Sequence, residues 1–197
     1  MTIAPGHPVI VAFVGLSGVG KTEATDIADA LLSPARFYFG GVVLNEVRKR
    51  GLDTTPENEA KVREELRAAH GMAAMAKLLL PDIRTALDED KPVLIDGLYS
   101  YAELKLLREA FGTALVTIAI HSRKTIRAER LAKRSVRPLT FAEMIERDRR
   151  EVEALEKAQP IALADYHVIN EGSVDDLRTA ISAIVDTVVA TEHLAAH

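Results

Sequence analysis

Two kinds of segment alternate along the chain. Short, continuous apolar runs are typical of parallel strands that are covered on both faces. Such runs, or shorter candidates for them, lie at residues 9–14, 36–39, 92–95, 114–120 and 165–170. Longer segments of helical character lie between them, several with apolar residues spaced three or four positions apart. These segments are residues 21–32, 42–50, 57–69, 72–88, 100–110, 141–157 and 174–193.

The alternation of strand and helix predicts a doubly wound α/β fold with a five-stranded parallel sheet and short right-handed crossovers. Two helical excursions depart from it. The first, about residues 41–88, lies between the second and third strands, and the second, about residues 135–157, follows the fourth. With 197 residues, 48% of them hydrophobic, and no long low-complexity tract, residues 1–197 are expected to form one domain.

A glycine-rich loop follows the first predicted strand. Its sequence is Gly15-Leu16-Ser17-Gly18-Val19-Gly20-Lys21-Thr22, which matches the phosphate-binding pattern Gly, four residues, Gly-Lys-Ser/Thr between a strand and a helix. The glycines let successive N–H groups turn inward toward an anion at a helix N-terminus. Lys21 is then placed to reach the β- and γ-phosphates of ATP, and the Thr22 hydroxyl to ligate Mg²⁺. A purely structural glycine turn is the alternative.

Asp96 ends the third predicted strand and is followed by Gly97. In an open parallel sheet, functional groups gather where the strands end at their carboxyl edge, and the first strand delivers the phosphate-binding loop to the same edge. Asp96 is therefore expected to position Mg²⁺ through water, or to accept a proton from an attacking hydroxyl. The alternative is that Asp96 only caps the next helix or turns the chain.

Four arginines follow the fourth predicted strand at spacings of four, three and four residues, which predicts one face of a helix. They are Arg123, Arg127, Arg130 and Arg134. A run of this kind is usually a solvated charged face, but here only Glu129 is interleaved with it. Because a guanidinium can engage phosphate oxygens in a bidentate way, we expect Arg130 and Arg134 to bind phosphate and Arg123 to serve the scaffold.

The net charge of −4 is unevenly distributed. Residues 121–150 hold ten Lys/Arg against four Asp/Glu, a balance of +6 that leaves −10 for the rest of the chain. This indicates a local anion site in an acidic protein and argues against general nucleic-acid binding. Arg147 and Arg150, one turn apart in the second excursion, would fold over bound phosphates as a small lid.

The cellular compartment is predicted from what the sequence lacks. There is no cysteine, so a reducing compartment is the simplest expectation. Residues 1–8 have no basic segment followed by an apolar one, and no apolar run approaches the roughly 20 residues of a membrane span. A cytoplasmic protein without membrane contact is expected.

With these motifs in this order, the chain resembles the nucleoside monophosphate kinase group of P-loop kinases, and within it the dephospho-CoA kinase branch and its archaeal-type, adenylate-kinase-related relatives. Besides the phosphate-binding loop, the resemblance rests on residues 40–52, 55–58, 94–97, 130–134, 146–148 and 164–173. It implies a three-layer α/β/α P-loop NTPase fold. In it, residues 41–88 would form a helical acceptor-binding insert and residues 135–157 a short lid.

Carried over position by position, the resemblance also implies a set of roles. The catalytic residues would be Lys21, Asp96, Arg134 and Arg147; the ATP site would comprise Gly15, Ser17, Gly18, Val19, Gly20, Lys21, Thr22 and Arg130; and the metal would be held by Thr22 and Asp96. Arg147 would stabilise the transferred phosphoryl group, and Arg130 and Arg134 would serve the ATP phosphates or stack on the adenine. Two departures concern the acceptor: Gly41 and Leu44 stand where relatives commonly have an aspartate and an arginine, and paired aspartates before Arg147 are missing.

The sequence therefore predicts an ATP- and Mg²⁺-dependent phosphotransferase that moves the γ-phosphoryl group to a small, nucleotide-like acceptor, of the nucleoside monophosphate or dephospho-CoA type. Two alternatives stay open. One is a nucleotide-binding regulatory protein or weak ATPase without a small-molecule acceptor, which the changes at Gly41 and Leu44 favour. The other is a kinase of a nucleoside, a sugar or a modified base. A monomer or a homodimer is expected.

Overall fold

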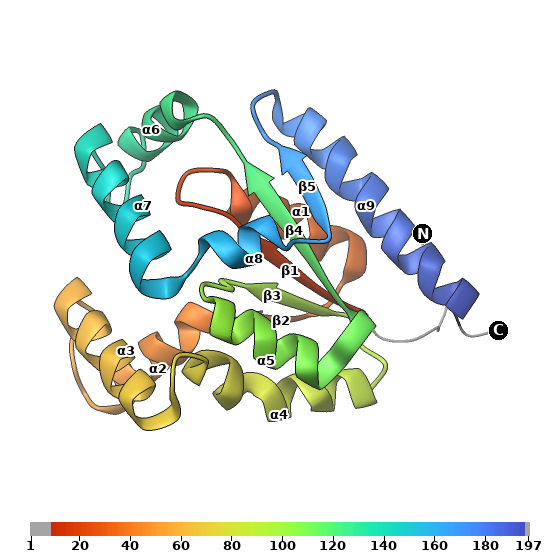
Figure 1. The fold of residues 1–197 in the computed structure, drawn as a ribbon, viewed down its shortest axis with the longest axis horizontal. Coiled ribbons are helices and arrows are strands. Elements are labelled where there is room, and N and C mark those ends of the chain that lie inside the picture. The colour runs from red at the N-terminus through yellow and green to blue at the C-terminus, as the bar shows by residue number, and fades with distance from the viewer. Residues whose placement is uncertain (1–8, 196–197) are drawn as a thin grey trace.

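The computed structural model describes residues 9–195, and in this range the chain forms a five-stranded, all-parallel sheet (Figure 1). The strands are β1 (Ile10–Val14), β2 (Ala35–Tyr38), β3 (Val93–Asp96), β4 (Leu115–His121) and β5 (Tyr166–Ile169). Their order across the sheet is β2-β3-β1-β4-β5, so the strand that enters the glycine-rich loop lies in the centre. The predicted α/β fold with a five-stranded parallel sheet is confirmed.

Helices connect the strands, and most of them lie where the sequence predicts. The helical segments of the described residues are α1 (Lys21–Leu32), α2 (Phe39–Lys49), α3 (Pro56–His70), α4 (Ala74–Asp88), α5 (Tyr101–Phe111), the short 3-10 turn η1 (Gly112–Ala114), α6 (Lys124–Ala132), α7 (Phe141–Leu155), α8 (Ala158–Ala162) and α9 (Val174–Ala195). Helices α2, α3 and α4 form the first predicted excursion. Helix α7 lies in the second.

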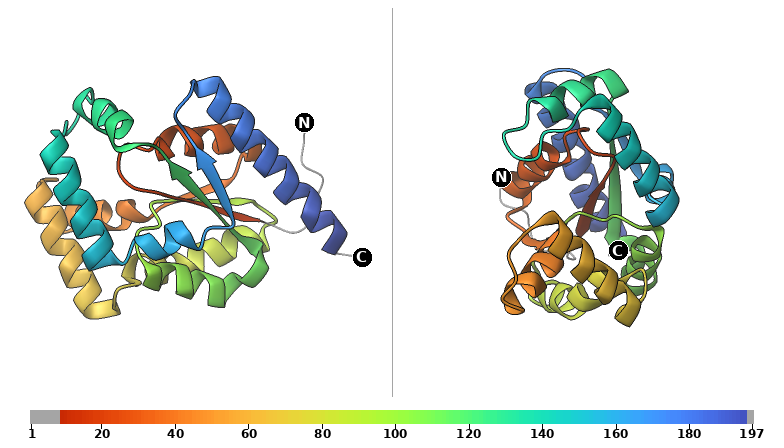
Figure 2. Two further views of the ribbon diagram at one scale, coloured as in Figure 1. Left: turned by 45° about the horizontal axis from the view of Figure 1, so that its top comes forward. Right: turned by 90° about the vertical axis from the view of Figure 1, so that its left-hand side faces the viewer.

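The two faces of the sheet are covered by different helices, as Figure 2 shows. Side chains on β1 alternate: Val11 and Phe13 pack with α1 and α9, whereas Ile10, Ala12 and Val14 pack with α2, α4 and α5 on the other face. All five are buried, as expected for the central strand of a three-layer α/β/α arrangement.

The register of the sheet brings three chain segments together at its carboxyl edge. Phe13, just before the glycine-rich loop, lies beside Asp96 at the end of β3, and Asp96 lies beside Tyr38 at the end of β2. The loop after β1, the loop after β3 and the start of α2 therefore emerge side by side. This is the edge at which open parallel sheets place their ligands.

Helix ends follow local chemistry. The Thr55 side chain accepts a hydrogen bond from the backbone N–H of Asn58 at the start of α3, and Pro56 occupies the first helical position. Gly71, with φ of 85°, ends α3 at the predicted break between two helices. A turn at residues 72–73 follows, so α4 begins two residues later than predicted.

The second excursion differs from the prediction at its end. Helix α7 stops at Leu155 because Glu156 takes the left-handed conformation, with φ of 52°. Lys157 then leads into α8, which the sequence did not predict. The result is a sharp corner between α7 and α8, and this corner brings Lys157 into the protein interior, where its side chain is 1% exposed.

Helix α6 is shorter than the segment that carries the four arginines, so the prediction of one shared helical face is wrong. Arg123 is the N-cap residue of α6, and Arg134 lies beyond its C-cap. Arg127 points inward and is buried, while Arg130 lies at the surface beside the glycine-rich loop. Tertiary partners, described below, separate positions that the spacing alone places together.

Residues 1–8, for which the sequence predicts no export signal, lie outside the described residues. Among the helices of the described part, none combines the length and the apolar character needed to cross a membrane.

Candidate nucleotide and acceptor site

The glycine-rich loop has the backbone conformation that its sequence predicts. Gly15, Gly18 and Gly20 have φ values of 147°, 83° and 97°, which residues other than glycine rarely adopt. Neighbouring elements also press against the loop: a Cβ added at Gly15 would lie 2.6 Å from the carbonyl oxygen of Ile120, and one at Gly18 would lie 2.9 Å from Cγ of Leu131. Glycine is therefore required here for both conformation and space.

Three side chains tie the carbonyl groups of the loop to the protein. Nε of Arg127 donates to the carbonyl oxygen of Ser17 at 2.7 Å, and Nδ2 of Asn170 donates to that of Val19 at 2.8 Å. Nη1 of Arg130 reaches the carbonyl oxygens of Asn170 at 3.1 Å and of Val19 at 3.4 Å. In a trans peptide the N–H points opposite to the C=O. The N–H groups of Gly18 and Gly20, which follow Ser17 and Val19, therefore point away from the side chains that bind those two carbonyls. The loop is thus fixed as an anion cradle.

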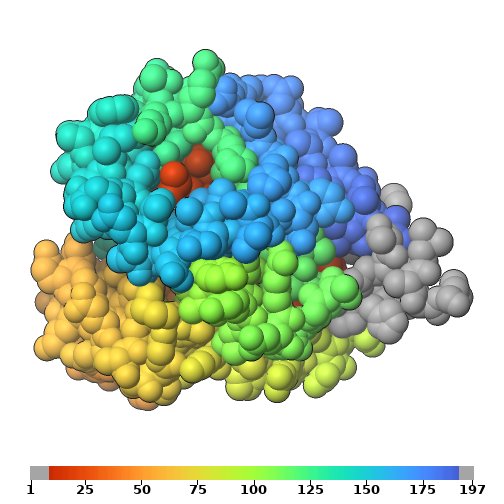
Figure 3. Space-filling view, in the orientation of Figure 1, coloured from red at the N-terminus to blue at the C-terminus, as the bar shows by residue number. Residues whose placement is uncertain are grey.

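Lys21 begins α1 and folds back over this loop. Its Nζ donates to the carbonyl oxygens of Gly15 at 2.8 Å and Leu16 at 3.0 Å. Burial, and next the positive charge of Lys157, lower the pKa of Lys21 to about 7. Thr22 is exposed beside it in the first turn of α1. Figure 3 shows this part of the chain, in red, recessed in a hollow framed by α6, α7 and the segment that contains α8.

Asp96 lies at the carboxyl edge of the sheet with an arginine as its partner. Nη2 of Arg36, on the neighbouring strand β2, lies 3.3 Å from Oδ2 of Asp96, and its Nη1 lies 3.0 Å from Oδ1 of Asp26 on α1. Arg36 was not predicted as a site residue, because it lies on the exposed side of the edge strand β2, where a charged residue is common.

The other predicted arginines have separate environments. Nη2 of Arg127 forms a buried ion pair with Oδ1 of Asp148, on α7, at 2.6 Å. Arg123 pairs with Glu171 at 2.7 Å. Arg134 is exposed and makes no side-chain hydrogen bond or ion pair with the described residues, so its predicted role in phosphate binding rests on the sequence alone.

Arg147 is held by a chain of charged contacts that the sequence did not predict. Its Nε donates to Oε1 of Glu151 at 2.9 Å, and the buried Lys157 donates to Oε2 of the same carboxylate at 2.6 Å. Nζ of Lys157 also lies 4.8 Å from the ring centroid of Tyr99. Burial is the largest single influence and would raise the pKa of Glu151, but the charges and hydrogen bonds of Lys157 and Arg147 together outweigh it, so the pKa is lowered. Burial likewise lowers the pKa of Lys157.

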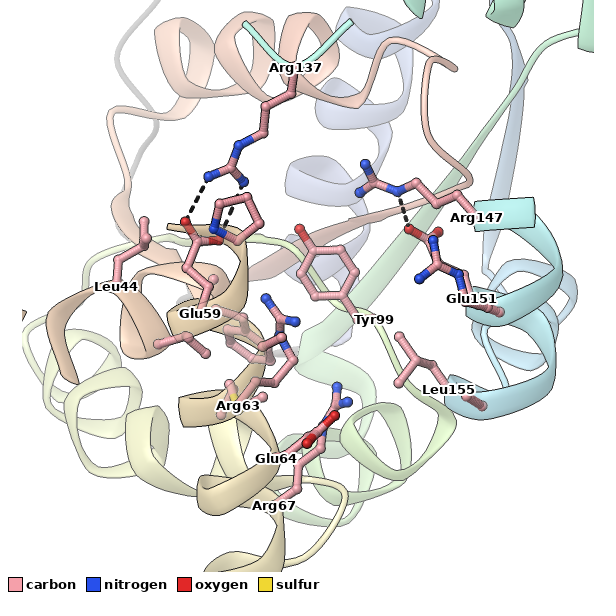
Figure 4. A pocket seen from close by; sticks show the side chains of 18 of the residues that line it. Leu44, Glu59, Arg63, Glu64, Arg67, Tyr99, Arg137, Arg147, Glu151 and Leu155 are labelled. Atoms are coloured by element: carbon pink, nitrogen blue, oxygen red, sulfur yellow. Dashed lines mark hydrogen bonds and ion pairs between the residues drawn. The ribbon is translucent and has the colours of Figure 1, made fainter. Parts of the chain in front are cut away.

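A cavity of about 1230 Å³ opens at this edge of the sheet, between the first excursion and α7 (Figure 4). Its lining includes Tyr38, Phe39, Val43, Leu44, Glu59, Arg63, Arg67, Met75, Tyr99, Arg137, Arg147, Glu151 and Leu155. Arg137, in the loop before α7, forms two hydrogen bonds with Glu59 of α3, the shorter of them 2.8 Å. This ion pair joins the two walls across the cavity.

Gly41 and Leu44, the two positions that depart from the pattern of the resembled family, both lie near the cavity wall. Gly40 and Gly41 lie in the first turn of α2, not before it as predicted, and the ring of Tyr38 lies against both. A Cβ added at Gly41 would be 3.3 Å from Cδ1 of Tyr38, so an acidic side chain there would compete with the ring for space. Leu44 adds an apolar surface to the cavity wall.

The residues of the loop fit a nucleotide with a magnesium ion. The cradle is formed, Lys21 is positioned over it, and a hydroxyl and a carboxylate, from Thr22 and Asp96, lie at the same edge. Among the described residues, no three or more His, Cys, Asp or Glu side chains are grouped to hold a metal by themselves. A magnesium ion that is bound through one or two side chains and the phosphates does not need such a group.

The central glycine-rich loop and the 2-3-1-4-5 sheet define a P-loop protein with a kinase-like fold, and a family profile described as an AAA domain matches residues 11–155. A UPF0200/UPF0201 protein of Archaeoglobus fulgidus is 39% identical over 178 residues, which cover 89% of this chain and 54% of the relative. A UPF0200 protein of Thermococcus onnurineus is 33% identical over 188 residues, 94% of this chain and 100% of the relative. The chain therefore carries this AAA domain and belongs to the UPF0200 family.

Two solved structures with the same fold are described as small-molecule kinases. A gluconokinase from Sinorhizobium meliloti superposes with a TM-score of 0.58 at 13% identity, over 98% of this chain and 99% of the other. A shikimate kinase from Acinetobacter baumannii, in complex with shikimate, superposes with a TM-score of 0.59 at 15% identity, over 93% and 94%. At such low identity the likeness shows the fold alone. The P-loop domain implies nucleotide binding, while the narrower resemblance to nucleoside monophosphate and dephospho-CoA kinases stays a prediction.

Proposed function

We propose that this protein is an ATP- and Mg²⁺-dependent phosphotransferase that transfers the γ-phosphoryl group to a small, nucleotide-like acceptor. The observation that carries the proposal is the cavity of about 1230 Å³ that meets the P-loop edge of the sheet and is lined by Arg147. A nucleotide switch or an ATPase needs only the P-loop, whereas a kinase also needs a space of this size for its second substrate.

The donor half of the proposed site consists of the loop and the first turn of α1. The N–H groups of the loop and the ammonium of Lys21 bind the phosphates, and Lys21 exchanges its bonds to two loop carbonyls for bonds to phosphate oxygens. Thr22 and Asp96 would hold Mg²⁺, and the bound ion would neutralise the negative charge that builds up during transfer. Arg130 is already fixed beside the loop and serves the nucleotide from there.

The transfer half consists of Asp96 at the end of β3 and Arg147 on α7. Asp96, oriented by Arg36, accepts the proton of the attacking hydroxyl. Arg147 has its Nε committed to Glu151, so its terminal nitrogens stay available for the phosphoryl group as its charge develops. In-line transfer needs positioning and charge neutralisation more than covalent chemistry, and these residues supply both.

The test is transfer of label from γ-labelled ATP to a panel of small acceptors, followed by separation of products. The proposal expects label on a small molecule, and Lys21→Ala to lower the rate about 10²-fold or more, as loss of a charge-stabilising donor does in other enzymes. Arg147→Met should lower kcat more than it weakens ATP binding, and Arg149→Met is its control on an exposed part of α7. Label found only as free phosphate, across the panel, would contradict the kinase assignment.

A further inference from the structure

The cavity contains a second group of cations, on α3. Arg63 and Arg67 are one helical turn apart and both line the cavity (Figure 4). Neither forms a hydrogen bond or ion pair with a described residue, and Nε of Arg67 is a buried donor without any partner. Buried donors without partners are rare in proteins because desolvation is not repaid, so Nε of Arg67 requires a partner, which is either a water molecule or a bound group.

The carboxylates around the cavity form no ion pair with these arginines among the described residues, although the charge of Glu64, which also lines the cavity, acts on Arg67. Glu59 is paired with Arg137, and Glu151 is held by two cations of the opposite wall. Burial lowers the pKa of Arg67, and the charge that opposes this most is that of Glu103. Oε2 of Glu103 accepts hydrogen bonds from backbone N–H groups at the start of α5, its Oε1 is buried without a hydrogen-bond partner, and the carboxylate forms no ion pair with Arg67.

This cationic group is separate from the one at the P-loop. Arg63 and Arg67 line the cavity from α3, whereas Arg147 lines it from α7. In Figure 4 the ring of Tyr99 lies between the α3 arginines and Arg147. An anion at α3 would therefore lie on the other side of Tyr99 from Arg147.

We propose that Arg63 and Arg67 form an anion subsite for a carboxylate or phosphate of the acceptor, remote from the oxygen that is phosphorylated. The inference rests on the proposed function and narrows its substrate class to hydroxyl compounds with an anionic group at the far end. The hydroxyl loses its proton, a new bond forms between its oxygen and the γ-phosphorus, and the bond from that phosphorus to the β–γ bridging oxygen breaks to leave ADP. A nucleoside monophosphate that accepts on its only phosphate is disfavoured.

The subsite can be tested without knowing the acceptor. With the P-loop filled by ADP and Mg²⁺, binding of inorganic phosphate and of acetate is measured by titration calorimetry on the wild type and on Arg67→Met, Arg67→Lys and Arg63→Met/Arg67→Met. Arg149→Met, on the exposed face of α7, is the matched control. We expect one further anion to bind the wild type and the control with equal affinity. The affinity should fall about tenfold or more in Arg67→Met. The loss should be smaller in Arg67→Lys, which keeps the positive charge but not the paired N–H donors of a guanidinium.

Each outcome has one meaning once far-UV circular dichroism shows that the variants are folded. If ADP-loaded wild type binds neither anion, or if the double variant binds as well as the wild type, the subsite is refuted. Preference between phosphate and acetate assigns the anionic group. If the arginine-dependent anion binds but no acceptor in the transfer panel is ever labelled, the subsite stands and the kinase function fails, so the two proposals fail separately.

Discussion

Arg127 offers the sharpest test of how the nucleotide loop is held. Its guanidinium is 3% exposed and joins three parts of the chain: it lies on α6, donates to the loop at the Ser17 carbonyl, and forms the 2.6 Å ion pair with Asp148 on α7. Arg127→Met keeps much of the side-chain volume but leaves a nearly buried carboxylate without its partner. The loop carbonyl loses its donor at the same time.

The expected cost can be worked out from these contacts. Removing one member of a buried ion pair costs about 3–5 kcal/mol, because the other charge is left uncompensated. Arg127→Met and Asp148→Leu should each cost that much. In the double variant both charges are gone, and the remaining loss is the hydrogen bond to the Ser17 carbonyl, about 1–3 kcal/mol. The coupling free energy of the pair is therefore expected to be at least about 3 kcal/mol.

The measurement is urea unfolding followed by circular dichroism, since the chain has no tryptophan. The two single variants, the double variant and Arg149→Met complete the set, and the exposed Arg149 control should change the free energy of unfolding by about 1 kcal/mol or less. Single costs below about 1 kcal/mol, or a coupling near zero, would refute the view that this pair clamps the loop to α7.

Three further predictions concern the loop and the lid. Gly20→Ala should abolish ATP binding because its Cβ would collide with the side-chain amide that ties the loop, whereas Gly51→Ala, also at positive φ but in open space, should bind ATP normally. If Lys157 acts by positioning Arg147, Lys157→Met should lower kcat when Arg147 is present but should cause no further loss in an Arg147→Met variant. Additive losses of kcat would instead show that Lys157 has a structural role. Because the folded-state pKa of Glu151 lies below its ordinary value of 4.5, Glu151→Gln should destabilise the protein at pH 7, with the difference from wild type shrinking as the pH falls below about 4.5.

The fold was predictable because its signals are local. The apolar run of β1, the glycine pattern after it and the position of Asp96 at the end of β3 each depend on neighbouring residues, and parallel strands covered by helices then determine the architecture. The sequence also placed the break at Gly71, where a left-handed backbone ends α3. Glycine marks such positions well, because few other residues adopt them.

The corner at Glu156 shows where this reasoning stops. A glutamate in the left-handed conformation carries no sequence signal, so the helix was predicted to continue through Lys157. The corner is nonetheless what turns Lys157 inward to Glu151 and the ring of Tyr99. Three residues from two distant segments meet there, and periodicity within one helix gives no information about such a meeting.

The four arginines that were predicted to share one helical face show the same limit of sequence-based prediction. Their spacing is regular, yet Arg127 is buried against Asp148, 21 residues later, while Arg134 lies in solvent beyond the helix. Helical spacing predicts which side chains share a face, but the partner on the opposite element decides which guanidinium is buried in an ion pair and which is left free.

The pairing of charges around the cavity bears on which acceptor the proposed kinase would bind. On the lid wall, Glu151 already compensates Arg147 and Lys157, and across the mouth Glu59 compensates Arg137. The arginines of α3 lack such a partner, so an anionic acceptor would supply the missing charge. If the proposed anion subsite exists, an uncharged acceptor would leave the partly buried Arg67 without a counter-charge, and this cost would discriminate against such an acceptor.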